Sequence, residues 1–220
     1  MTEYGTPEPA APDTIVLIHG LWMTPRSWEH WVDHYEGKGY RVIAPAYPGL
    51  EVEVEALRDD PSPIEALNVP SIVEHLEGVV SGLEHPPIIM GHSMGGLLTQ
   101  ILLEHGYGAA GVAIDSVPGP GGIIWAGVLA NFTPGHQDTY IDFANEDRAP
   151  LLIIAGGEDN IMPPAVNESN AKHYRRSKAL TDYKEVEGRS HFTVGQPGWE
   201  EVADYALQWA VEHAAVRPSA

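Results

Sequence analysis

The chain alternates short apolar runs with segments of helical periodicity, and this alternation most restricts the folds open to it. The run at 14–20 is apolar and rich in β-branched residues, as a strand buried on both faces is. Six strands are predicted in all, at 14–20, 40–49, 86–90, 109–116, 149–157 and 181–188.

Helical patterns separate the strands. They cover about 28–37, 71–83, 94–106, 164–177 and 198–213. Thr24-Pro25 offers an N-cap followed by Pro at the first helical position, and Ser71 with Glu74 forms a capping-box pattern. The polar, proline-broken segment 51–70 is expected to be a loop. Strands that alternate with helices favour the doubly wound α/β class, with a mainly parallel sheet of about six strands flanked by helices.

Length and charge limit the class of protein further. The 220 residues suffice for one such domain, expected over 14–215 after a disordered leader at 1–13. Twelve Lys and Arg stand against 31 Asp and Glu, and this net charge of −19 disfavours nucleic acid and anionic membrane surfaces. The chain has no cysteine, which excludes disulfides and thiolate catalysis. Because no apolar run stands near its start, we expect a cytoplasmic location.

Residues just after the strands are the candidates for chemistry, because ligands of such sheets bind beyond the carboxyl ends of the strands. The stretch GHSMGG at 91–96 joins an apolar strand to an apolar helix and fits the pattern G-x-S-x-G. That turn exposes the serine hydroxyl, while the glycines remove side chains that would collide. We interpret Ser93 as a nucleophile. The alternative is that small residues only ease the packing of strand on helix.

An acid and a base follow Ser93 in the chain order that this turn requires. Asp159 lies in the loop after the run 149–157, and Asp115, after the preceding strand, is the rival acid. The candidate base is His191, which lies between the last strand and the last helix. Among 11 histidines it alone combines the right loop with the right order.

The other histidines are given no catalytic role. His19 is expected to shape its own loop, and the ring of His92 is expected to project away from the serine. His30 and His34 are four residues apart and would need a third metal ligand, which the sequence does not provide. We therefore expect no metal and no cofactor.

Four stretches together resemble the α/β-hydrolase superfamily, in particular its small esterases and non-haem peroxidase-like members. They are VLIHGLW, GHSMGG, GGEDNIMPP and GRSHF, and the resemblance covers about residues 14–213. It implies that Ser93 is the nucleophile, His191 the base and Asp159 the acid that orients the base.

The same resemblance implies an oxyanion hole and a substrate wall. The backbone amides of Leu21 and Met94 would form the hole, with Trp22 as the alternative to Leu21. The indole of Trp22 would also line the acyl pocket.

Two departures from the family pattern bear on the site. The family usually begins with two further strands, and many members insert a helical cap after the strand that corresponds to 109–116. Here a connector at 117–123, rich in Pro and Gly, stands in the place of the cap. The apolar residues expected around the open mouth are Trp22, Ile123, Ile124 and Trp125. Such a mouth favours short acyl esters, or self-association into a homo-oligomer.

The resemblance implies a serine carboxylesterase that cleaves small carboxylic esters through an acyl-enzyme. Perhydrolase or lyase activity on the same residues is the alternative, although 113–147 lacks the lysine that a cyanohydrin lyase of this fold would carry. A non-catalytic ligand-binding protein is the third possibility, because a fold does not determine a function. The expected partner is a small-molecule ester, with no nucleic acid and no membrane.

Overall fold

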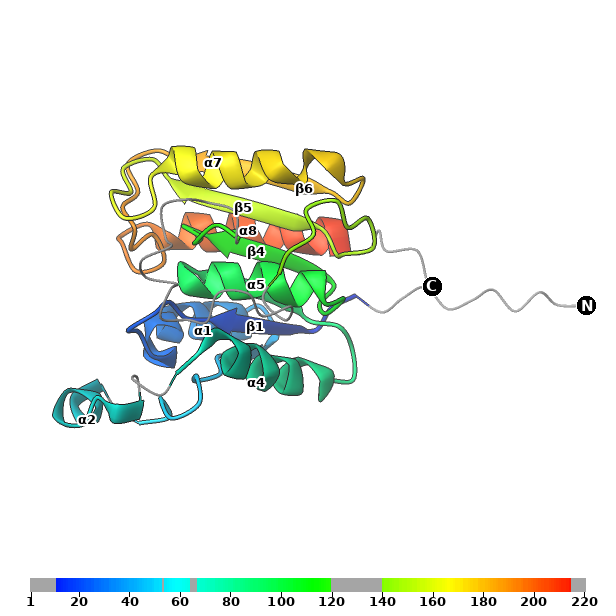
Figure 1. Ribbon diagram of the computed structural model, residues 1–220. Coiled ribbons are helices and arrows are strands. Elements are labelled where there is room, and N and C mark those ends of the chain that lie inside the picture. The colour runs from blue at the N-terminus through cyan, green and yellow to red at the C-terminus, as the bar shows by residue number, and fades with distance from the viewer. Residues whose placement is uncertain (1–10, 53, 64–66, 120–139, 215–220) are drawn as a thin grey trace, which may run out of the picture.

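The computed structural model describes residues 11–52, 54–63, 67–119 and 140–214 (Figure 1). Within these residues, six parallel strands form one sheet in the order β2-β1-β3-β4-β5-β6. The strands are β1 Thr14–Ile18, β2 Arg41–Ile43, β3 Ile88–His92, β4 Ala110–Ile114, β5 Leu151–Gly156 and β6 Thr181–Val186. Each overlaps a predicted run, and the doubly wound α/β class is confirmed.

Helices follow the strands as the alternation predicts. They are α1 Glu29–Glu36, α2 Val54–Asp59, α4 Val69–Ser81, α5 Met94–Glu104, α7 Pro164–His173 and α8 Trp199–Ala214, with 3-10 turns η1 Pro25–Trp28 and η4 Tyr174–Arg176. No helix in the described ranges combines the length and the hydrophobicity needed to cross a membrane.

The sheet is covered on both faces, and its central strands β1, β3, β4 and β5 are buried at every position. Ile15 and Leu17 pack on one side with α1 and α8, whereas Val16 and Ile18 pack on the other with α4 and α5. Figure 1 shows α4, α5 and α7 stacked along one face, with α8 behind the sheet. Side chains alternate across a strand, so each strand contributes to both cores.

The strand order places a crevice above β1 and β3. β1 pairs with β2 on one side and with β3 on the other, so the connections that leave these strands diverge to opposite faces. Ligands of doubly wound sheets bind at such a switch point, beyond the carboxyl ends of the strands. Leu21 follows β1 and Ser93 follows β3, so both lie at this edge.

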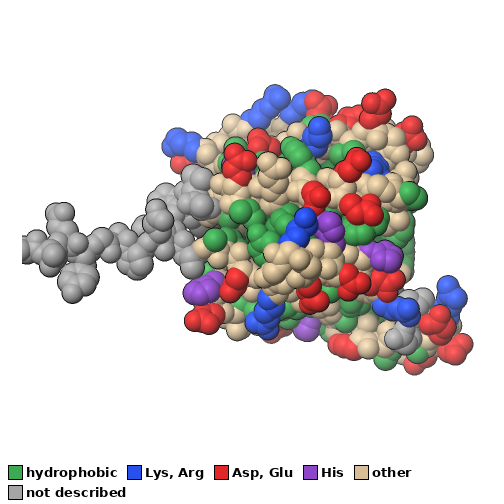
Figure 2. All heavy atoms as spheres, turned by 180° about the vertical axis from the view of Figure 1, so that it is seen from behind, with side chains coloured by type: hydrophobic (Ala, Val, Ile, Leu, Met, Phe, Trp, Pro, Cys, Tyr) green, Lys and Arg blue, Asp and Glu red, His purple; other side chains and the backbone are tan. Residues whose placement is uncertain are grey.

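The surface carries the acidic excess of the composition. Figure 2 shows Asp and Glu side chains scattered over the face seen from behind the view of Figure 1, where α8 lies. A negative field of this kind repels anionic ligands and favours neutral ones.

Two elements differ from the sequence prediction. The expected loop 51–70 contains the helix α2, whose sequence VEALRD is rich in good helix formers and ends before Pro61. The expected strand 40–49 shrinks to the three residues of β2. Pro45 follows closely and has no amide hydrogen to donate, so pairing along this edge strand stops.

The start of α4 also differs. Asn68 is the N-cap, and its side-chain oxygen accepts from the amide of Ser71 at 3.0 Å. The predicted capping box of Ser71 and Glu74 is therefore wrong, because the helix begins two residues earlier with Pro70 in its first turn. Thr24 occupies the N-cap position of η1 without a side-chain capping bond.

We expect Asn68→Ala to lower the free energy of unfolding by about 1 kcal/mol, because an N-cap side chain satisfies an amide without an intrahelical partner. Urea denaturation measures the loss. The exposed Glu74→Ala is the matched control and should change stability by less than about 0.5 kcal/mol. A larger loss of stability for Glu74→Ala than for Asn68→Ala would instead support the predicted capping box of Ser71 and Glu74.

Candidate active site

Ser93 stands at a sharp turn between β3 and α5, with φ 56° and ψ −114°. Its amide donates to the carbonyl of Ile114 at 2.9 Å, which ties the turn to β4. A Cβ at Gly91 would collide with the carbonyl of Gly95, and a Cβ at Gly95 would collide with the carbonyl of Ile18. Glycine at both positions is therefore a condition for this turn, as the sequence pattern predicted.

Backbone strain concentrates at this edge of the sheet. Among the described non-glycine residues, positive φ occurs at Trp22, Ser93 and Asp115. They follow β1, β3 and β4 respectively, so all three lie at the carboxyl ends of neighbouring strands. Each such conformation costs of order 1–3 kcal/mol, and proteins retain such strain mainly at functional sites.

A chain of hydrogen bonds joins Ser93 to two residues from distant loops. His191 Nε2 lies 3.0 Å from Ser93 Oγ, and His191 Nδ1 lies 2.7 Å from Asp159 Oδ2. With a carboxylate at Nδ1, the proton of the neutral ring resides there, and Nε2 is free to accept from the serine hydroxyl. The structure thus brings together the three residues that the sequence selected.

The carboxylate of Asp159 is held rigidly. Its other oxygen, Oδ1, accepts from the amides of Ile161 and Met162 at 2.7 and 2.8 Å. The side chain has no exposed surface. Because one oxygen is fixed by two amides, the other stays aimed at His191.

Asp115, the rival acid, is bonded elsewhere. Its Oδ1 accepts from the amide of Gly156 at 2.6 Å, at the end of β5. Burial raises the pKa of Asp115 to about 7. The ring of His191 is hydrogen-bonded to Asp159. Asp115 instead links the end of β4 to the turn that carries Asp159.

His92 contacts the site, contrary to the expectation that its ring projects elsewhere. Its Nε2 lies 2.6 Å from the carbonyl oxygen of His191, and the two rings are 4.9 Å apart between centroids. Burial lowers the pKa of His92 to about 4, so the ring is neutral and donates from Nε2. Met90, two residues earlier, shares its face of the sheet and packs with Val194 from the same loop as His191. The period-two alternation of β3 was the signal that could have placed His92.

His19 shapes the turn after β1, as the sequence predicted. Its Nδ1 lies 2.8 Å from the carbonyl oxygen of Gly20, and its ring packs on Tyr47 at 3.9 Å between centroids. The hydroxyl of Tyr47 donates to the carbonyl of His19. Burial lowers the pKa of His19 to about 4, so the ring adds no charge to the turn that leads to Leu21.

A buried polar network, which the sequence did not reveal, fixes α5 against α7. Gln100 donates to the hydroxyl of Ser116 at 2.8 Å and accepts from Asn170 at 2.9 Å. Asn167 accepts from the amide of Ser116 at 3.0 Å. The helix α5, which directly follows Ser93, is thereby fixed to α7, the helix that follows the Asp159 loop.

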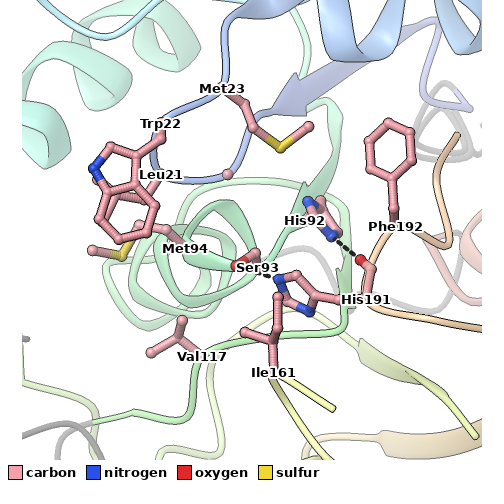
Figure 3. Close-up of a pocket in the computed structure, with 11 residues that line it drawn as sticks. Leu21, Trp22, Met23, His92, Ser93, Met94, Val117, Ile161, His191 and Phe192 are labelled. Carbon is pink, nitrogen blue, oxygen red and sulfur yellow. Dashed lines mark hydrogen bonds between the residues drawn. The ribbon is translucent and has the colours of Figure 1, made fainter. Parts of the chain in front are cut away.

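A pocket of about 170 Å³ opens above Ser93 (Figure 3). Its lining is almost entirely apolar and consists of Gly20, Leu21, Trp22, Met23, His92, Ser93, Met94, Val117, Ile161, His191 and Phe192. The large apolar side chains at its mouth are exposed, by 74% for Trp22, 58% for Ile161 and 47% for Phe192. The pocket therefore offers a small apolar volume next to the hydroxyl of Ser93 and the imidazoles of His92 and His191.

Leu21 and Met94 are the two residues whose amides the sequence analysis expected in the oxyanion hole. Both line the pocket beside Ser93. α5 begins at Met94, so its amide is one of the first-turn donors that have no partner within a helix.

Several predicted features fall outside the described residues. These are Ile123, Ile124 and Trp125, the connector beyond residue 119 and the leader up to residue 10. The described start of the connector is buried, and Val117 lines the pocket.

One group in the described part of the chain has the spacing of a metal site. Ligand atoms of His92, Asp115 and His191 lie within 4.8 Å of one another. However, His92 Nε2 is bonded to a carbonyl, and both ring nitrogens of His191 are bonded to Asp159 and Ser93. A metal there would have to break these bonds, so metal-free chemistry remains our prediction. His30 and His34 instead contact Glu29 and Asp204, respectively.

Comparisons with known proteins agree with this architecture. A family model described as "Alpha/beta hydrolase family" matches residues 15–144, more than half of the chain. No curated protein matches the chain in sequence.

Solved structures share the fold at low identity. A monoacylglycerol lipase from Paleococcus ferrophilus superposes with a TM-score of 0.67 at 20% identity, covering 93% of this chain and 97% of the lipase. A butyrate-bound thermophilic esterase from Thermogutta terrifontis gives 0.71 at 15% identity, covering 99% of this chain and 89% of the esterase.

We expect Asp115→Asn to gain stability relative to the parent as the pH rises. The pKa of Asp115 is raised from 3.8 to about 7, so the folded state retains a proton that the unfolded chain releases. The parent therefore loses stability from about pH 4 through about pH 7, and the uncharged Asn does not share this loss.

Urea denaturation of both proteins at about pH 4 and about pH 8 measures the effect. At about 1.4 kcal/mol per pKa unit, the stability difference should grow by a few kcal/mol in favour of the variant. A difference that stays constant with pH would contradict a protonated, buried Asp115.

Proposed function

Since the chain belongs to the alpha/beta hydrolase family, we propose that it is a serine carboxylesterase for small carboxylic esters. The observation that carries the proposal is the unbroken hydrogen-bond chain from Asp159 through His191 to Ser93. A nucleophile, a base within hydrogen-bonding reach and a third group that orients the base are what acyl transfer requires.

In the first half-reaction, Ser93 Oγ attacks the ester carbonyl carbon. His191 Nε2, at 3.0 Å, takes the hydroxyl proton as the bond forms. The carboxylate of Asp159 stays ionised, holds the ring by Nδ1 and stabilises the imidazolium.

The negative charge that develops on the carbonyl oxygen needs donors. We assign this role to the backbone amides of Leu21, in the loop after β1, and Met94, at the start of α5 after β3, because both residues line the pocket. Such preorganised amides stabilise the transition state more than the ground state. The hydrogen bond of Tyr47 to His19 keeps the Leu21 side of the hole in place.

Collapse of the tetrahedral intermediate completes acylation. The bond to the leaving alcohol breaks, and the alkoxide takes the proton from His191 Nε2 to leave as the alcohol. In the second half-reaction, water gives a proton to His191 and attacks the acyl-enzyme. The acid is then released, and the proton returns to Ser93.

The pocket favours neutral, small substrates. Its volume of about 170 Å³ is apolar apart from Ser93 and the two histidines, and the chain as a whole carries a net charge of −19. Trp22 then serves as a wall for the acyl group. Burying apolar substrate atoms against Trp22, Ile161 and Phe192 supplies the binding energy.

We expect Ser93→Ala to abolish hydrolysis of p-nitrophenyl esters and His191→Ala to lower kcat by roughly 10³-fold or more, because members of such a unit act together. The fold should survive, since the Ser93 hydroxyl contributes little packing. Ser190→Ala is the matched control, because this serine adjoins His191 but bonds Gln196, and it should stay within a few-fold of the parent.

Reaction with a fluorophosphonate probe, alongside turnover, separates an enzyme from a ligand-binding protein of this fold. Labelling and hydrolysis must both disappear in Ser93→Ala. Hydrolysis by Ser93→Ala within a few-fold of the parent would defeat the proposal.

We expect Asp159→Asn to lower kcat strongly and Asp115→Asn to lower it only slightly. Asparagine at 159 keeps the shape but removes the anion that sets the tautomer of His191, a change that costs about 10⁴-fold in a serine protease. Comparison of kcat for the two variants, with circular dichroism as a check on folding, gives the ranking. The reverse ranking would move the acid to the end of β4.

A further inference from the structure

A second cavity adjoins the Ser93 pocket. It has a volume of about 230 Å³ and is lined by Leu21, Trp22, Met23, Thr24, Leu50, Leu57, Arg58 and Leu67. Leu21, Trp22 and Met23 also line the Ser93 pocket, so the two spaces share one wall.

We propose that this second cavity is the acyl-chain subsite of the enzyme and that Trp22 is the partition that limits entry of the chain. The proposal rests on the proposed esterase function and names the part of the substrate that the cavity accepts.

The position of His191 decides which side of the ester points to the cavity. The leaving alcohol takes its proton from His191 Nε2, so its oxygen must lie on the His191 side of Ser93. The acyl chain, on the same carbon, therefore points away from His191. Figure 3 shows Trp22 beside Leu21 and Met94, on the opposite side of Ser93 from Phe192. The second cavity includes neither His191 nor Phe192 in its lining.

The walls of the cavity suit a hydrocarbon chain. Leu50, Leu57 and Leu67 are buried, with 2, 8 and 9% of their surfaces exposed. Arg58 is exposed, so its charged end stays in water while its methylene groups contribute to the lining. None of the described residues that line the cavity is acidic. Burial of an alkyl group in such surroundings is favourable, whereas burial of a polar group without a hydrogen-bond partner is unfavourable.

The stability of the fold does not explain why a tryptophan occupies position 22. Its φ of 60° is a left-handed conformation that favours glycine and strains a bulky side chain. Its side chain is 74% exposed, so little burial offsets this strain. A large aromatic residue that is strained and exposed between two cavities is accounted for by contact with a ligand.

Trp22→Gly tests the partition, because glycine adopts this φ without strain and removes the indole from the wall that the two cavities share. The ratio of kcat/KM for p-nitrophenyl octanoate to that for the acetate should rise by about tenfold or more, since each methylene that enters the second cavity adds roughly three- to fourfold. Thermal unfolding should show no loss of stability. Tyr205→Ala, an exposed aromatic on α8, is the control and should leave the ratio unchanged.

A second variant refills the cavity. Adding Leu57→Trp to Trp22→Gly should cancel the gain for octanoate, because the new indole occupies the space that the chain would enter. If this double variant does not fold, Leu67→Phe in the same background serves instead. A series of alkyl acetates, in which only the alcohol lengthens, should respond to neither change.

The outcomes separate the two proposals. If the folded parent hydrolyses no ester of the panel, the esterase proposal fails, and the subsite fails with it. If the parent hydrolyses esters but Trp22→Gly leaves the acyl-chain profile unchanged, only the subsite is overturned. If the alkyl acetates respond in place of the acyl series, the cavity holds the alcohol and the acyl assignment is wrong.

Discussion

The close approach of α5 to the ends of β1 and β3 is the constraint on which the rest of the site depends. Gly91 and Gly95 permit it, because a Cβ at either position would collide with a backbone carbonyl. The approach forces Ser93 into a strained turn. The hydrogen bond from the amide of Ser93 to the carbonyl of Ile114 holds this turn in place. Ser93 and Met94, the first residue of α5, then line the same pocket as His191.

Features that arise from local pattern and chain order could be predicted from the sequence. Apolar runs marked the central strands, and their alternation with helical patterns predicted the parallel arrangement. Ser93, Asp159 and His191 were selected because each follows a strand in a fixed order, and the sheet brings such positions to one edge. Their catalytic roles and the substrate remain proposals.

The alternation along β3 could have placed the side chain of His92, but the partners of contacts between distant segments could not be predicted. His92 meets His191 across 99 residues, and Asp115 bonds Gly156 across 41. The six-residue α2 is too short to give a clear hydrophobic periodicity. The structure shows that its Leu57 packs in the core. These contacts position the loops of the site. The sequence therefore predicted which residues come together there, but not the contacts that hold them in place.

The central claim is that Ser93 carries the acyl group during turnover. Rapid quenching of the protein with p-nitrophenyl butyrate, followed by mass spectrometry of its peptides, tests this claim directly. We expect one butyryl group per chain, on the peptide that contains Ser93, formed together with a burst of p-nitrophenol. Turnover with no acylated peptide, or with the butyryl group on another residue, would contradict it.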